Sequence, residues 1–254
     1  KRTDNTIIPC IELRNRMSMS KYKTYEALTN NSGKIPCDHF LPSITPQTKT
    51  LTMEAMAIAR LADKADVIKQ KLLLCKNDWQ FVLHLFVARA FGMRVNAEPF
   101  EQLAKQLHPK YIAKYRNNED VIHALCFGVA GFLHPTLRDD YPQSLYRQYA
   151  FYKHKHDMQE MSVAQWNFLR MRPANFPTIR IAQLATMLTN TQDLFHRLYN
   201  DLTYHHILTL FDAALPDYWT NHYRFDEISA PKQKGMGKAL IHTVIINAVV
   251  PVFY

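Results

Sequence analysis

The sequence predicts a mainly α protein, a multi-helix globular domain that follows a short N-terminal strand or extended segment. Glycine is scarce, with 6 among 254 residues, whereas sheets with many tight turns need it. After residue 50, apolar residues recur at intervals of three and four along most of the chain, which is the spacing of one helix face. The hydrophobic share of 47% and the charged share of 21% are typical of a soluble globular protein.

The beginning of the chain differs from the rest. Residues 5–13, "NTIIPCIEL", alternate and are rich in β-branched side chains, so they predict a short strand interrupted by a proline. No sheet is evident for this strand, and the chain begins with Lys1 rather than Met. We therefore expect residues 1–15 to be an extended remnant of a missing upstream domain, residues 16–49 a loop-rich linker, and residues 50–254 the helical domain.

The helical domain opens with one apolar stripe, formed by Ile58, Leu61, Ala65, Ile68 and Leu72. A second helix follows, because Asn77 or Asp78 can cap its start and Gly92 can end it. Asn96 is the expected N-cap of the next helix. Further helices are predicted over residues 117–133, 141–156, 162–170, 178–188, 191–202 and 237–253.

The net charge and the cysteine pattern limit the classes of partner that we expect. The net charge of +9, with the histidines neutral, favours a polyanion such as nucleic acid. The four cysteines form no CxxC pair, so a cysteine-based metal site is not expected and a reducing cytoplasm fits best. No run approaches the roughly 18 apolar residues of a membrane span, so we expect no membrane partner.

No motif for catalysis or for a cofactor is present. The densest set of potential metal ligands is His154, His156 and Asp157, but positions i and i+2 do not share a helix face, so a basic helix end is favoured. No GxSxG motif and no Cys with a motif-linked His occur. We therefore predict no metal, no cofactor and no catalytic residue, and we expect the chain alone not to be catalytic.

Two arginines stand before a proline in "RMRPANFP", residues 170–177. A helix that runs into Pro173 leaves carbonyls without donors, and Arg170 and Arg172 could supply several. Arg180 joins them if the segment doubles back. Two alternatives stay open, a buried structural cluster and a site for an anion or nucleic acid. We predict that at least two of the three arginines are buried and bonded to carbonyls or acids.

A second candidate anion site precedes the last helix, where Lys234 and Lys238 flank backbone amides at a glycine-rich helix start. It is not a Walker A loop, because Ala239 stands where Ser or Thr would bind magnesium. An ordinary loop entering a helix is the simpler interpretation.

An aromatic cluster, "YWTNHYRF", spans residues 218–225. Its candidate site residues, which could stack nucleic-acid bases, are Trp219, His222, Tyr223 and Arg224. The same side chains could instead fill a core while their polar tips bond locally, and we favour this alternative.

Several of these segments resemble the bacterial family of domain of unknown function 2851. The resemblance is carried by "WNFLRMRPANFPTIRIAQLA" (166–185), "NDWQFVLHLFVARAFGMRVNAEPFEQLA" (77–104), "IHALCFGVAG" (122–131), "YWTNHYRF" and "IINAVVP". It implies that this chain is the C-terminal helical part of a longer protein. It also implies an upstream strand-rich region similar to restriction-endonuclease-like nucleases. The chain departs from the pattern at His123 and Val129, where the resemblance implies Glu and Gln.

Two hypotheses of function follow. The first is a helical domain that binds nucleic acid or assists an upstream nuclease-like domain of the same protein. The second is a structural or protein-interaction scaffold without a ligand, in which the arginines only hold the chain's own corners. An independent enzyme is a third, weaker hypothesis. The oligomeric state is not predicted.

Overall fold

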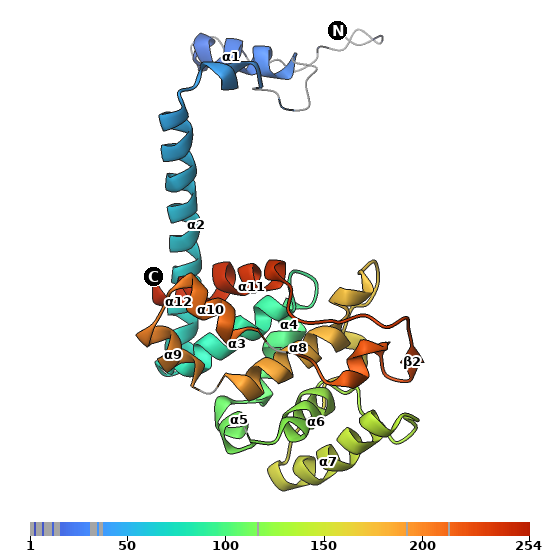
Figure 1. Cartoon of the computed structure of the whole chain (residues 1–254). Helices are drawn as coiled ribbons and strands as arrows, with labels where there is room; N and C mark the ends of the chain where they lie inside the picture. The colour runs from blue at the N-terminus through green and yellow to red at the C-terminus, as the bar shows by residue number, and fades with distance from the viewer. Residues whose placement is uncertain are drawn as a thin grey trace. The chain divides into compact units, whose positions relative to one another are not determined.

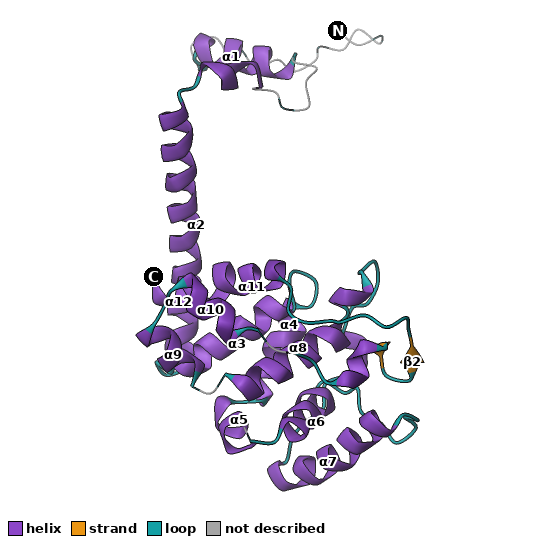
Figure 2. Cartoon of the chain, viewed as in Figure 1, coloured by secondary structure: helices purple, strands orange, loops and turns teal. Residues whose placement is uncertain are grey.

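The computed structural model of the chain is mainly α-helical, which confirms the predicted fold class (Figures 1 and 2). It describes residues 16–30, 38–115, 117–191, 193–212 and 214–254, with Thr3, Ile7, Glu12 and Ile35. The strand predicted over residues 5–13 lies almost wholly outside the described residues. The chain divides into two parts, Lys1–Ile58 and Ala59–Tyr254.

The first part contains helix α1 (Met19–Thr29), a 3-10 turn (Asp38–Ser43) and the start of α2 (Pro46–Leu74). Helix α1 therefore occupies a segment that the sequence analysis assigned to a loop-rich linker. Two local features explain why α2 begins at Pro46. Pro46 fits the first helical position, and the Thr45 hydroxyl accepts the backbone N–H of Thr48 at 3.2 Å.

The second part begins within α2, whose last turns bury Ala65, Ile68 and Leu72. The predicted stripe is confirmed there, whereas Ile58 is exposed. Helix α3 (Trp79–Phe91) is buried from Val82 to its end apart from Arg89, and the Asp78 carboxylate caps it by accepting the Phe81 N–H at 2.8 Å.

Gly92 ends α3, as predicted, but not through a left-handed conformation. A Cβ at this position would lie 2.3 Å from the carbonyl oxygen of Asn96, a distance that excludes any side chain. Helix α4 (Ala97–Gln106) follows and packs against α3. The left-handed residue of the turn is Met93.

The middle of the chain forms a helical layer. Helix α6 (Glu119–Val129) lies between α7 (Asp140–His156) and α8 (Pro177–Asn190), and α5 (Pro109–Tyr115) also contacts α6. Gly128 allows the close approach of α7, because a Cβ there would lie 2.1 Å from the Tyr149 ring.

The chain ends in short elements (Figure 1). They are α9 (Leu194–Asn200), α10 (Tyr204–Leu210), strands β1 (His222–Arg224) and β2 (Glu227–Ile228), α11 (Lys238–Val244), a π-helical turn (Ile245–Val249) and α12 (Val250–Phe253). The strands pair antiparallel, with His222 opposite Ile228.

The helix predicted over residues 162–170 is wrong. Only a 3-10 turn (Val163–Gln165) forms there, followed by irregular chain. The Trp166 indole donates to the Ala130 carbonyl at 2.8 Å, and Asn96 binds the backbone of Asn167 at both its N–H and its carbonyl. These long-range contacts replace the hydrogen bonds that a helix would have made.

Candidate functional site

The prediction that at least two of the three arginines are buried is wrong. Arg170 and Arg172 are exposed, and neither side chain has a hydrogen bond or ion pair within the described part of the chain. No helix runs into Pro173, so there are no helix-end carbonyls for them to satisfy. Arg170 instead occupies a left-handed turn with φ of 57°. The expectation that at least two of the three arginines are buried therefore fails.

Arg180 is the exception, being 8% exposed. Its guanidinium donates to Asn175 Oδ1 at 2.6 Å and to Gln183 Oε1 at 2.9 Å. Both partners are neutral amides, and burial lowers the pKa of Arg180 to about 10. The arrangement matches the structural alternative more closely than an open anion site.

Lys234 belongs to the same polar network. The Gln183 side chain donates to the carbonyls of Lys234 and Gly235, both at 3.1 Å. The buried Lys234 ammonium in turn donates to the carbonyls of Trp219 and Thr220, at 2.5 and 2.8 Å. The Lys234 side chain thus joins the segment before α11 to the backbone at residues 219–220. Lys238 is exposed at the start of the short helix α11 and lies apart from this network.

The aromatic cluster is a packing unit. Trp219 is fully buried and stacks on Phe127, with ring centroids 5.3 Å apart. The Arg224 guanidinium lies over the rings of Phe168 and Phe176, 4.6 and 4.9 Å from their centroids. These contacts use the faces that a base would need, so the core interpretation fits the structure.

A polar network that the sequence did not reveal surrounds this cluster. The Tyr218 hydroxyl donates to Asp139 Oδ2 at 2.7 Å and accepts the Asp226 N–H at 3.0 Å. Asp226 accepts the backbone N–H groups of Arg138 and Asp139, and the His222 ring stacks on Tyr218 at 4.0 Å. The network ties the β1–β2 turn to the start of α7.

A different surface combines exposed cations with aromatic rings. It is formed by α5 and the end of α7, and we call it the α5–α7 surface; it consists of Lys110, Tyr111, Lys114, Tyr115, Phe151, Tyr152, His154, Lys155 and His156. Tyr115 contacts both Tyr152 and His156, which joins the two helices. Phe151 is 60% exposed.

Lysines lie beside these rings. The Lys155 ammonium is 5.9 Å from the Tyr115 ring centroid and 5.5 Å from that of Phe151. The Lys114 ammonium is 5.7 Å from the Tyr115 ring. Burial lowers the pKa of His156, and the positive charges of Lys114 and Lys155 lower it further.

The charge of the α5–α7 surface is largely uncompensated. Within the described residues, Lys110, Lys114 and Lys155 form no ion pair, whereas Lys153 pairs with Glu160 at 2.8 Å. From the sequence alone, the end of α7 was interpreted only as a basic helix end. The signal that could have revealed it is the repeated Lys–Tyr neighbourhood in "PKYIAKY" and "FYKHKH".

A second basic region lies in a groove of about 580 Å³ between α2, α3 and the C-terminal segment. Its cations are mostly engaged. Lys64 donates to Ile246 O and Asn247 Oδ1, and Arg89 pairs with Glu101. Asp63 and Arg94 also line the groove. This groove is therefore less available to a polyanion than the α5–α7 surface.

In the described ranges, no group of three or more His, Cys, Asp or Glu side chains is arranged to hold a metal ion. The same ranges contain no helix with the length and apolar character needed to cross a membrane.

A family model described as "Protein of unknown function (DUF2851)" matches residues 1–254. The chain belongs to the DUF2851 family. The match extends the resemblance to the whole chain, including the first 49 residues. No curated protein and no solved structure matches it.

The two positions where the chain departs from the expected DUF2851 pattern are both fully buried. His123 is bonded to the Tyr141 hydroxyl and to Thr186 Oγ1, each at 3.0 Å, and lies 3.5 Å from a Glu119 carboxylate oxygen. Val129 lies in the apolar core. These contacts give His123 a structural role between α6, α7 and α8.

Proposed function

We propose that this DUF2851 chain binds single-stranded nucleic acid on the α5–α7 surface. The observation that carries the proposal is the placement of Lys114 and Lys155 beside the Tyr115 ring, without a carboxylate partner among the described residues. Unpaired ammonium groups attract phosphates, and exposed rings offer a face on which unpaired bases stack.

The exposed Phe151 ring favours a single strand over a duplex. A duplex hides the faces of its bases, whereas a single strand can place one on an aromatic side chain. The formal charge of +9 supports association with a polyanion. In a longer protein, this surface would hold a strand for an upstream nuclease-like domain.

Fluorescence anisotropy with labelled oligo-dT and oligo-rU tests the proposal. We expect binding at low salt that weakens linearly in log[salt]. The double variant Lys114→Gln, Lys155→Gln should reduce the slope by about 1.4, since each phosphate contact on a single strand contributes about 0.7. Lys238→Gln is the matched control, because Lys238 is an exposed lysine outside the surface.

Phe151→Ala separates stacking from charge. The ring is largely exposed, so its loss should leave the fold intact while weakening binding about fivefold or more, without changing the salt slope. Absence of binding at low salt, or an unchanged slope in the double lysine variant, would refute the proposed function.

The alternative is a protein-interaction scaffold. Within the described residues, α2 exposes Leu51, Met53 and Met56 at 65%, 71% and 61%. Such apolar exposure favours a covering partner, such as another domain of the same protein. Replacing all three with Gln should abolish any concentration-dependent association in sedimentation experiments. Association that is unchanged by the triple replacement would exclude this face.

A further inference from the structure

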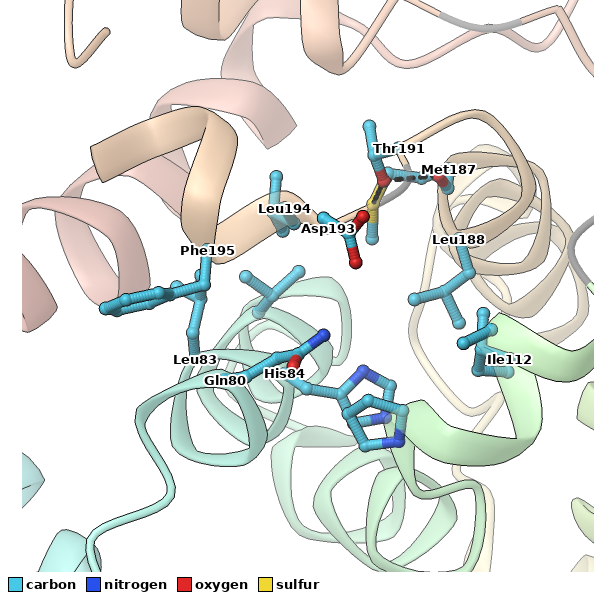
Figure 3. A pocket seen from close by; sticks show the side chains of 13 residues that line it. Gln80, Leu83, His84, Ile112, Met187, Leu188, Thr191, Asp193, Leu194 and Phe195 are labelled. Atoms are coloured by element: carbon cyan, nitrogen blue, oxygen red, sulfur yellow. Dashed lines mark hydrogen bonds between the residues drawn. The ribbon is translucent and has the colours of Figure 1, made fainter. Parts of the chain in front are cut away.

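The spaces between the helices differ widely in size. The cavity lined by α3, α5, α8 and the start of α9 (Figure 3) has a volume of about 60 Å³, which is room for about two water molecules. The groove between α2, α3 and the C-terminal segment has a volume of about 580 Å³. Pockets that bind small molecules commonly measure about 300–1,000 Å³. The groove therefore has the size of a ligand site, whereas the cavity does not.

The floor of the groove is apolar. Phe86 and Ala90 line it from α3, Val67 lines it from α2, and Met93 completes it. Val67 is 53% exposed and Met93 is 40% exposed, so apolar surface remains open to solvent inside a recess with polar groups at its rim. Such surface is typical of a binding groove. We therefore expect the groove to take a ligand with an apolar body.

Met93 has a backbone conformation that favours glycine. Its φ is 54°, in the left-handed region that is unfavourable for a side chain. The Met93 sulfur lies 3.7 Å from the Arg180 guanidinium, and the side chain lines the groove. An observed backbone outlier is a reason to look for a function. A methionine at this position supplies a flexible apolar surface that can adapt to a ligand.

Positive charge lies at the rim of the groove. Arg94 is exposed, and its side chain has no hydrogen bond or ion pair within the described residues. Lys64 donates only to neutral oxygens, Ile246 O at 3.1 Å and Asn247 Oδ1 at 2.6 Å. Burial lowers the pKa of Lys64, and the charge of Arg60 lowers it further. A nearby anion would therefore stabilise the Lys64 ammonium.

The neighbouring acids leave this positive charge in excess. Arg89 pairs with Glu101, but two lysines pair with the same carboxylate, so one negative charge faces three cations. Asp63 is the acid among the described residues that line the groove. Because the other cations of the lining are engaged and Arg94 is free, the groove suits a ligand with a single negative charge.

The C-terminal side of the groove is formed by an unusual element, the π-helical turn Ile245–Val249. Such turns are rare and occur frequently at functional sites. The Asn247 side chain lines the groove, accepts from Lys64 and donates to the Thr243 carbonyl at 2.9 Å. The Ile246 carbonyl of the same turn also accepts from Lys64. The turn thereby holds the Lys64 ammonium at the groove.

We propose that this groove binds a small amphiphile, an acyl chain that ends in one carboxylate. The chain lies on the apolar floor, and the Arg94 guanidinium donates to the carboxylate beside the Lys64 ammonium. The proposal is independent of nucleic-acid binding on the α5–α7 surface.

Octanoate and 1-octanol are a matched pair of probes for this site. They share an eight-carbon chain, but only octanoate is charged at pH 7. In NMR titrations of the ¹⁵N-labelled full chain, both should shift the amide resonances of Val67 and Ala90. Octanoate should bind at least about tenfold more tightly, because a hydrogen bond to a charged group adds to the burial of the chain. Equal affinity for the two probes, or no binding of octanoate, would overturn the proposal.

Arg94→Gln tests the carboxylate contact. Octanoate should then bind no more tightly than 1-octanol, whose own affinity should not change. Arg172→Gln is the matched control, because Arg172 is an exposed arginine outside the groove. A preference for octanoate that persists in Arg94→Gln would contradict the assignment of Arg94 to the carboxylate.

Val67→Gln tests the apolar floor. It should weaken the binding of both probes about threefold or more, because it removes apolar contact from the chain. Leu73→Gln is the control on the same helix, since Leu73 is exposed and does not line the groove. The replaced residues are all exposed, so we expect the variants to stay folded. Octanoate binding that is unchanged in both Arg94→Gln and Val67→Gln would place the ligand elsewhere and refute this site.

Discussion

The Tyr115 hydroxyl and His156 Nε2 are hydrogen-bonded at 2.6 Å, and this contact joins α5 to the last turn of α7. The His156 ring also stacks on Tyr152 and contacts Tyr111, so it sits among three tyrosines. The pairing holds Lys114 and Lys155 on one surface although they are 41 positions apart in the sequence.

Tyr115→Phe should lower the free energy of unfolding by about 1 kcal/mol, because it removes this hydrogen bond and leaves the ring contacts in place. Urea denaturation measures the change. Nucleic-acid affinity should fall less than in the Lys114→Gln, Lys155→Gln variant, since the cations remain. A larger loss of affinity than in the lysine variant would show that the hydroxyl itself contacts the ligand.

Arg180→Ala should lower the stability of the fold far more than Arg172→Ala. Loss of Arg180 leaves the half-buried Asn175 oxygen and the buried Gln183 oxygen without their donor and should cost at least about 2 kcal/mol. Loss of the exposed Arg172 should change stability by less than about 0.5 kcal/mol. Thermal or urea unfolding of the two variants decides the matter, and equal effects would contradict the assignment of Arg180 as the structural arginine.

Asn96→Ala should destabilise the chain by about 2–3 kcal/mol. The Asn96 side chain is 1% exposed and binds the backbone of Asn167 twice, accepting its N–H at 2.8 Å and donating to its carbonyl at 3.0 Å. Asn167→Ala is the control, because that exposed side chain accepts only the nearby Leu169 N–H. Amide exchange at Asn167 should accelerate in the first variant and not in the second.

Local signals predicted several elements correctly because the deciding contacts are local. Asp78 caps α3 through a residue three positions away, and the stripe on α2 follows from spacing alone. Asn96 was predicted as a helix N-cap, but its side chain makes no capping bond and instead reaches Asn167. No local sequence pattern could predict that Asn96 binds Asn167, which lies 71 positions away.

In the candidate site, too, the contacts that the sequence did not predict are long-range ones. Arg180 and Lys234 meet through Gln183, a contact that depends on the folded arrangement of α8 and the loop before α11. Arg170 and Arg172 were predicted to be buried because a helix was expected to end before Pro173. That helix does not form, since Trp166 and Asn167 are held by α6 and the start of α4.

Glu101 should give the chain a distinct acid transition. This carboxylate is 5% exposed and receives three cations, Lys71 at 2.8 Å, Arg89 at 2.5 Å and Lys105 at 2.9 Å. Burial acts to raise its pKa, but the hydrogen bonds from the three cations outweigh burial and lower the pKa from 4.5 to about 2. The pKa in the folded state therefore lies below that in the unfolded state.

The sign of the pH effect follows from this difference. The stabilisation is complete above about pH 4.5 and disappears as the pH falls towards 2, because the unfolded chain binds the proton first. The cations are partly exposed, so we expect about 2 kcal/mol rather than the full value of the shift. Glu101→Gln should lose this amount at pH 7. Its stability should then change less than that of the unmodified chain between pH 4.5 and 2 in urea titrations, and a parallel pH profile would show that Glu101 does not carry the transition.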